Sequence, residues 1–260
     1  MKKYLLLLIF TGIFIPCKIY AVDIAVGATT WYAWSDNSKI DPAFFSGPEL
    51  SVKLNKDYNL TFVYLYGKFN MKDDESVTTS KIKRQDADFA LNYRFADYFK
   101  LFSGIKYLKR SYNYSEEDPG WTLLLVLGAS KYDATRTIDS FGPGLGLSAA
   151  YPMFENLFLF GTLSGLYLRE NYEEKYLKET VTLSAVPPLP GITDKEEGKN
   201  SKTFSSYGYN LTMAIAYYIP SVGAVISLGG RYHSFIKTDD LSNEKTFYGV
   251  TLTATYSFSI

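Results

Sequence analysis

The chain has 260 residues and a formal net charge of zero, and 17% of its residues are aromatic, including 23 Tyr and 18 Phe. A near-neutral balance argues against nucleic acid as a partner, because nucleic-acid surfaces need clustered positive charge. A helical membrane protein would need several apolar stretches of about 20 residues. Only one segment comes near that length, at the N-terminus. The composition therefore disfavours both of these classes.

The N-terminal segment has the three parts of a secretory signal peptide. It begins with two lysines at residues 2–3, continues with an apolar core over residues 4–15, and ends at the small residue Ala21. We predict a signal peptide over residues 1–21 and a single mature domain over residues 22–260.

The only cysteine, Cys17, lies inside this predicted peptide. Pro16 before it and Lys18 after it match the lipoprotein pattern poorly. Cleavage after Ala21 leaves a mature chain without cysteine, which excludes cysteine catalysis and thiolate zinc sites.

The mature chain alternates between apolar and polar residues with a period of two, which is typical of β-strands. In the final segment, 248–260, apolar residues take the even positions and threonine or serine takes most of the odd ones. Three further segments repeat this pattern: 86–95, 144–151 and 207–217. Segments 60–69 and 157–168 are apolar on both faces, so their orientation stays open.

Three features favour a membrane barrel over a soluble β-sandwich. One face of each alternating strand is small or polar, as a water-filled lumen requires, while the apolar face suits lipid. Short turns alternate with long polar links, as in barrels with periplasmic turns and outer loops. Aromatic residues also gather at both strand ends, as in the girdles of such barrels. We place Trp31, Tyr32 and Trp34 in one girdle, and Phe95, Tyr98, Phe99, Tyr217, Tyr218, Tyr256 and Phe258 in the other.

We predict an all-β, antiparallel transmembrane β-barrel of ten strands, with eight or twelve as alternatives. The strands are expected at 22–34, 47–55, 59–69, 84–95, 98–110, 138–151, 157–169, 203–218, 222–236 and 245–260. Short periplasmic turns are expected near 56–59, 96–98, 152–156 and 220–223, and long outer loops at 35–46, 70–83, 111–137, 171–202 and 237–244. An even count places both termini on the periplasmic side.

An apolar run at 121–129 lies inside one of these expected loops. We interpret it as the upward extension of a hairpin above the membrane. A further strand pair, or a loop folded onto the barrel mouth, are the alternatives.

The end of the chain resembles the C-terminal strand signal of bacterial outer-membrane proteins, because Tyr256, Phe258 and Ile260 alternate along one face. The mature chain is thus similar to the broad superfamily of small Gram-negative outer-membrane β-barrel proteins, and no motif ties it to one family. The resemblance implies an outer-membrane location and recognition by the barrel-assembly machinery. It also implies outer-membrane lipids and lipopolysaccharide as partners.

The strongest polar constellation lies on the predicted inner faces of the fourth and fifth strands. It comprises Asp86, Asp88 and Arg94 on one strand and Lys100, Lys106 and Arg110 on the other. A turn near 96–98 puts Asp88 opposite Lys106, and we predict an ion pair between them. The group either fills a narrow lumen as a salt-bridge network or lines a selective pore. Ten strands favour a plug or a thin water path, since open channels appear nearer sixteen.

His233 is the only histidine, and it shares its predicted inner face with Arg231 and Ser227. A histidine is a natural general base at neutral pH. Omptin-like proteases have an Asp two residues before their His, where this chain has Arg231. Lipid A deacylases have a His and a Ser two residues apart, but here Phe235 takes that position. We therefore expect His233 and Arg231 to line the lumen without catalysis.

The sequence thus predicts a non-enzymatic, surface-exposed outer-membrane barrel without a cofactor or metal, with a narrow porin-like channel for small solutes as one role. The acidic clusters at 73–75 and 116–118 are expected to be solvated, and divalent-cation binding is their alternative. One alternative function is an outer-membrane enzyme, a protease or a lipid A-modifying protein, acting at the barrel mouth. The other is an adhesin acting through the loops at 112–137 and 171–202.

Overall fold

The computed structural model describes residues 23–71, 77–79, 82–123, 126–184, 192–237 and 246–259. The predicted signal peptide at 1–21, the acidic cluster at 73–75 and the terminal residue Ile260 lie outside these ranges. Within the described ranges, no helix is long and apolar enough to cross a membrane.

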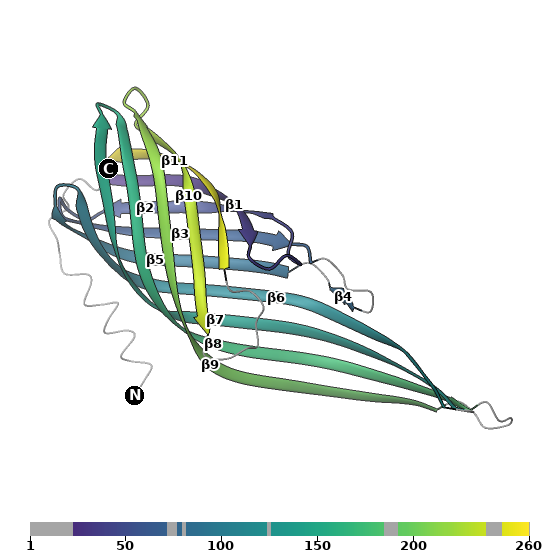
Figure 1. The fold of residues 1–260 in the computed structure, drawn as a ribbon. Coiled ribbons are helices and arrows are strands. Elements are labelled where there is room, and N and C mark those ends of the chain that lie inside the picture. Colours follow the sequence, from purple (N-terminus) through teal and green to yellow (C-terminus); the bar gives the residue numbers. More distant parts are fainter. Residues whose placement is uncertain are drawn as a thin grey trace, which may run out of the picture.

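Ten antiparallel strands form a closed ring (Figure 1). They are β1 (Asp23–Ser35), β2 (Ala43–Lys53), β3 (Tyr58–Phe69), β5 (Ile82–Ala96), β6 (Phe99–Leu123), β7 (Val126–Phe154), β8 (Leu157–Ser184), β9 (Ile192–Ile219), β10 (Ala224–Lys237) and β11 (Thr246–Ser259). β11 pairs with β1 from Asp23↔Ser259 to Ser35↔Phe247 and closes the ring. A short strand, β4 (Val77–Thr79), pairs with β6 and lies outside the ring. The predicted ten-stranded barrel is confirmed.

The short connections lie at the end of the ring that holds Asp23 and Ser259. They span residues 54–57, 97–98, 155–156 and 220–223, close to the predicted turns. In the last of them Gly223 has a φ of 65°, in the left-handed region that glycine adopts without a steric cost. The predicted short turns at this end are therefore confirmed.

Side chains alternate between the outside and the inside of the ring. On β9 the six odd-numbered side chains from Tyr207 to Tyr217 are 40–56% exposed, and the even-numbered ones between them are less exposed. On β11 Leu252 is 51% exposed and Thr251 only 8%. The predicted orientation of both strands is confirmed, and the outer surface of the ring is a broad apolar band.

The two strands whose orientation the sequence left open are now assigned by burial. On β3 Leu65 and Phe69 are buried, so its odd positions face inward. On β8 Ser164, Leu168 and Glu170 are buried, so its even positions face inward. Their outward faces complete the apolar band.

Aromatic rings mark both edges of this band. At one edge the rings of Trp34 and Tyr248 stack with their centroids 6.1 Å apart. At the other edge Phe95 stacks on Phe99 at 6.2 Å and Tyr256 on Phe258 at 6.1 Å. Both predicted girdles are therefore present, but placing Trp31 in one of them was wrong. Odd positions of β1 face inward, and Trp31 is completely buried.

Four strands run far beyond the rest of the ring (Figure 1). β6, β7, β8 and β9 have 25, 29, 28 and 28 residues. Their ring neighbours end at the pairs Lys83↔Ser111 and Lys237↔Ser206. We call the remaining sheet the extension; it comprises residues 112–123, 126–137, 172–184 and 192–205.

The outer loops expected at 111–137 and 171–202 were therefore wrong, because most of these residues form the extension. Trp121 pairs with Gly128 near the end of the β6–β7 hairpin. The described parts of the apolar run, 121–123 and 126–129, extend this hairpin, as we interpreted it. The prolines at 187–190 lie outside the described residues.

The outward orientation of β9 predicts unequal costs for two arginine substitutions. Leu211→Arg puts a charge on the lipid-facing surface and should destabilise the barrel by about 2–4 kcal/mol. Thr162 lies at the same level of β8 and faces a cavity of about 350 Å³ inside the ring, so Thr162→Arg should cost much less. Urea unfolding of the three proteins in lipid vesicles measures the difference. Equal losses at the two positions would contradict the assignment.

Candidate functional site

A layer of buried side chains crosses the lumen toward the end of the ring that carries the extension. All ten ring strands contribute a side chain that is at most 2% exposed. These are Trp31, Phe45, Leu65, Asp86, Lys106, Ser140, Glu170, Ser206, His233 and Phe247, in strand order from β1 to β11. We call this layer the lumen plug. Every strand of the ring therefore contributes to the filling of the lumen at this end.

One half of the plug is aromatic. The ring of Phe45 lies 5.4 Å from Trp31 and 4.8 Å from Phe69, and Phe69 lies 5.3 Å from Phe247. The guanidinium of Arg84 lies 4.4 Å from the Phe247 ring centroid. At this range the negative face of the ring attracts the cation. The aromatic half therefore also stabilises the charged half.

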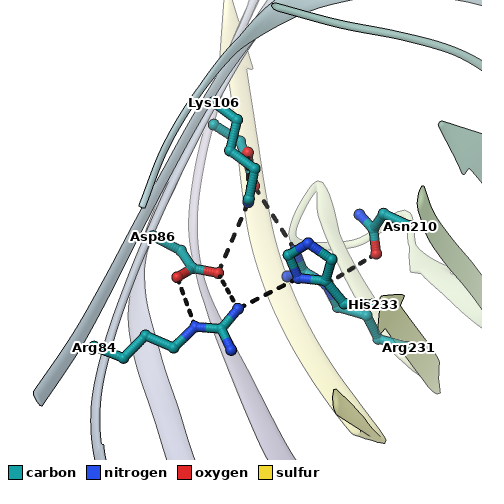
Figure 2. A network of polar contacts seen from close by, with 7 residues as sticks. Arg84, Asp86, Lys106, Asn210, Arg231 and His233 are labelled. Atoms are coloured by element: carbon teal, nitrogen blue, oxygen red, sulfur yellow. Dashed lines mark hydrogen bonds and ion pairs between the residues drawn. The ribbon is translucent and has the colours of Figure 1, made fainter. Parts of the chain in front are cut away.

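The other half is a network of ion pairs (Figure 2). Arg84 donates to both carboxylate oxygens of Asp86, at 2.9 and 3.0 Å. Lys106 donates to both oxygens of Asp88, at 2.8 and 3.0 Å, and its Nζ lies 3.7 Å from Asp86. The ion pair that the sequence predicted between Asp88 and Lys106 is confirmed.

Burial makes this pairing necessary. Arg84 is completely buried, and the side chains of Asp86 and Lys106 are 2% exposed. An unpaired ion in such a place costs several kcal/mol, which only a well-matched partner offsets. A second buried pair, Arg110 on β6 with Glu170 on β8 at 2.9 Å, meets the same requirement.

His233 lies inside this network and is fully buried. Its Nδ1 is 3.3 Å from an Nη atom of Arg84. A guanidinium only donates hydrogen bonds, so Nδ1 accepts and the imidazole is neutral. The ring also packs against Phe235, with centroids 4.3 Å apart. The imidazole is therefore in contact with the guanidinium of Arg84 and with the phenyl ring of Phe235.

Arg231 connects the two halves of the plug. Its guanidinium lies 4.9 Å from the Trp31 ring centroid. It donates to Asn210 at 3.3 Å (Figure 2). It also lies 3.8 Å from Asp88. Arg231 thus joins the Asp88 carboxylate of β5 to the aromatic cluster.

Six of the eight predicted lumen charges therefore meet at the plug or beside it: Asp86, Asp88, Lys106, Arg110, Arg231 and His233. Arg94 and Lys100 do not. They face each other in the register of β5 and β6 and line cavities of about 440 and 250 Å³ at the end with the short turns. Lys100 also borders the cavity of about 350 Å³ beneath the plug.

The sequence prediction missed Arg84, Glu170 and the aromatic half of the plug. Arg84 could have been found, because it precedes Asp86 by two residues and so shares its face. Glu170 lies one residue beyond the expected end of its strand. That strand is apolar on both faces, so nothing in its pattern showed which side Glu170 takes.

Among the described residues, no group of three or more His, Cys, Asp and Glu side chains is arranged to hold a metal ion. The acidic residues 116–118 belong to β6, where successive side chains alternate between the two faces. Their three carboxylates therefore do not all lie on one face of the sheet.

The closed ring, the outward apolar band and the two aromatic girdles define an integral outer-membrane β-barrel protein. Closure leaves no strand edge in lipid, and the girdles bound the apolar band at both membrane interfaces.

No family model and no curated protein matches the chain. Its structural neighbours are outer-membrane β-barrel proteins. The outer membrane protease OmpT from Escherichia coli is 8% identical with a TM-score of 0.46, over 93% of this chain and 98% of that one. The translocator domain of the autotransporter NalP from Neisseria meningitidis is 10% identical with a TM-score of 0.45, over 99% and 95%. The attachment invasion locus protein Ail of Yersinia pestis is 14% identical with a TM-score of 0.27, over 92% and 98%. Likeness at this level says nothing about what this chain binds or does.

The plug predicts that its two carboxylates differ in importance. Asp86→Asn leaves the buried guanidinium of Arg84 without its carboxylate, and should destabilise the barrel by about 3–5 kcal/mol. Asp88 is 35% exposed, and its partner Lys106 keeps Asp86 nearby, so Asp88→Asn should cost about 1 kcal/mol. Urea unfolding in lipid vesicles compares the two. Equal costs for the two substitutions would contradict the greater importance of Asp86.

Proposed function

We propose that this protein is a non-enzymatic outer-membrane barrel whose lumen is closed to solutes, and whose extension attaches to a macromolecule outside the cell. The lumen plug is the observation that carries this proposal. A barrel blocked across its whole width is suited to anchoring, and the part that reaches into the surroundings is the extension.

The closed lumen is supported by the width of the barrel as well as by the plug. Around eight strands the interior is just filled by side chains, and ten strands add little room. Here that room is taken by aromatic rings and paired ions. The cavity of about 350 Å³ beneath the plug is lined by Lys100, Asn92, Thr162 and other groups, and Lys106 of the plug borders it.

The extension has two unlike faces. The face that continues the lipid-facing surface is charged, with ion pairs such as Lys199 to Glu173 at 3.0 Å and Lys131 to Glu117 at 3.5 Å. Exposed pairs of this kind contribute little to stability but keep a sheet surface soluble. This face is therefore suited to contact with water.

The face that continues the lumen wall carries tyrosines. The rings of Tyr132 and Tyr176 stack with centroids 5.4 Å apart, and Tyr114 meets Tyr132 at 6.2 Å. Arg136 lies 4.7 Å from the Tyr114 ring and donates to Glu174 at 2.6 Å. A hollow of about 380 Å³ opens among these side chains.

Such a face is suited to recognition. Tyrosine offers a large, rigid contact area at a low cost in conformational entropy, and tyrosine and arginine are enriched where binding energy concentrates. The hydrogen bond to Glu116 raises the pKa of Tyr114 to about 12, so its hydroxyl keeps its proton at neutral pH. The tyrosine face, defined by Tyr114, Tyr132 and Tyr176, is our candidate for the attachment surface.

The enzyme alternative has less support. His233 is buried, and its Nδ1 lies 3.3 Å from the guanidinium of Arg84, which is a cation and not a catalytic acid. A general base must reach the proton that it removes, and a substrate would have to pass through the plug to reach His233.

Closure of the lumen predicts that the native protein does not conduct ions in a planar lipid bilayer. Trp31→Ala/Phe247→Ala empties the aromatic half of the plug and should produce discrete channels. Single-channel recording of both proteins at equal insertion, checked by heat-dependent mobility in gels, makes the comparison. Steady conductance through the native barrel would contradict the closed lumen.

Attachment through the extension predicts that shortening it removes binding while the barrel still assembles. Residues 113–135 and 173–201 can each be replaced by Asn-Gly, which joins the paired residues Tyr112 with Arg136 and Tyr172 with Lys202 by tight hairpin turns. Cells that display either version are measured for retention on immobilised extracellular-matrix proteins and glycans. We expect retention by the native protein and its loss in the shortened one.

Two matched variants locate the binding face. Tyr114→Ser/Tyr132→Ser/Tyr176→Ser alters the tyrosine face and should reduce retention about tenfold or more. Lys131→Ser/Lys175→Ser/Lys199→Ser alters the charged face and should change it little. The proposal fails if shortened and native proteins retain cells equally, or if only the charged face matters.

A further inference from the structure

Two lysines stand directly opposite each other on the outward surface of the barrel. Lys68 on β3 pairs in register with Lys83 on β5, and both side chains are exposed. Like charges at directly opposed positions on one sheet face destabilise the strand pair. Neither lysine has an ion pair or hydrogen bond with a described residue. An anion bound between the two lysines would offset their repulsion.

A third cation lies beside them on the same face. Lys109 on β6 pairs with Gln85, which places it diagonally next to Lys83, whose own partner on β6 is Ser111. Diagonal neighbours are about 7–8 Å apart, within reach of long side chains. Asp139 lies 3.6 Å from Lys109, and it also accepts a hydrogen bond from Tyr107 at 2.9 Å. One shared carboxylate leaves the group of three strongly positive. We call Lys68, Lys83 and Lys109 the basic patch.

The basic patch lies at the outer edge of the apolar band. The outward positions that precede it on these strands are Tyr66 and Tyr64 on β3 and Tyr107 on β6, followed deeper in the band by Phe62 and Ile105. Phe62 is 36% exposed and Ile105 47%. A lipid whose acyl chains lie along these residues would bring its headgroup to the lysines.

We propose that Lys68, Lys83 and Lys109 form a binding site for the phosphate headgroup of an anionic lipid in the outer leaflet. Lysine binds phosphate as a compact point charge with three donors. Exposed lysines alone hold free phosphate weakly in water. A lipid adds the contact of its acyl chains with the band, so it binds where inorganic phosphate does not.

The site is independent of the attachment proposed for the extension. The lysines lie on β3, β5 and the ring part of β6, whereas the tyrosine face begins at Tyr114. Failure of one proposal therefore leaves the other unaffected.

The test uses the full chain, purified in detergent and titrated with bis-phosphorylated lipid A, with the same lipid after removal of its phosphates, and with inorganic phosphate. Native mass spectrometry counts the bound lipid. We expect one tightly bound phosphorylated lipid, weaker binding of the dephosphorylated one, and no displacement of the lipid by millimolar inorganic phosphate. Binding should weaken as salt is raised, since exposed charges are screened.

Lys68→Gln/Lys83→Gln should weaken the phosphorylated lipid about thirtyfold, given the attraction that each lysine contributes near an anionic surface. Lys68→Arg/Lys83→Arg keeps both charges and should bind nearly as well as the native protein. The matched control Lys53→Gln/Lys56→Gln removes two charges at the opposite end of the barrel and should leave affinity unchanged. Heat-dependent mobility in gels confirms that each variant is folded.

Four results would overturn the proposal. The first is equal affinity of the native and Lys68→Gln/Lys83→Gln proteins. The second is an equal loss in the Lys53→Gln/Lys56→Gln control, which would mean that only total charge matters. The third is equal binding of the phosphorylated and dephosphorylated lipids. The fourth is full displacement by inorganic phosphate, which would make the patch a site for the free anion.

Discussion

A β-sheet placed in lipid has to satisfy every backbone donor and acceptor within itself, because the surroundings offer no hydrogen bonds. In this protein the pairing of β1 with β11 meets that requirement by closing the ring. Closure with ten strands also fixes the width of the lumen. The inward side chains of all ten strands must then share a narrow space, and any charge among them must find a partner there. The ion pairs of Arg84 with Asp86 and of Lys106 with Asp88 are a consequence of that confinement.

Confinement also explains why aromatic rings and charges meet in one layer. Trp31, Phe45 and Phe247 fill the volume on one side, and the guanidiniums of Arg84 and Arg231 lie against these rings. A ring face attracts a cation most strongly where water is excluded. The plug is thus a packed core, although it lies inside a membrane protein whose large apolar surface faces outward.

The extension shows what happens to the same strands once lipid no longer surrounds them. The two faces continue without a break, but their chemistry is exchanged. The face that was apolar against lipid becomes charged, as at Glu173 and Lys199, and the face that was polar in the lumen becomes aromatic, as at Tyr132 and Tyr176. The basic patch lies at the level where this exchange begins.

The sequence by itself determined the strands that cross the membrane. Lipid demands an apolar face and the lumen accepts a polar one, so the 207–217 and 248–260 segments carry a strong period of two. That period also put Asp88 opposite Lys106, since a turn of known position sets the register of neighbouring strands. Only the tertiary structure showed that residues 112–123, 126–137, 172–184 and 192–202 continue as strands. Beyond the membrane both faces of a sheet meet water, so the alternation fades into a pattern that resembles a polar loop. Only the closed ring brought Trp31, Arg84 and His233 together, because they come from strands far apart in the sequence, and no local pattern encodes which of them meet across a lumen.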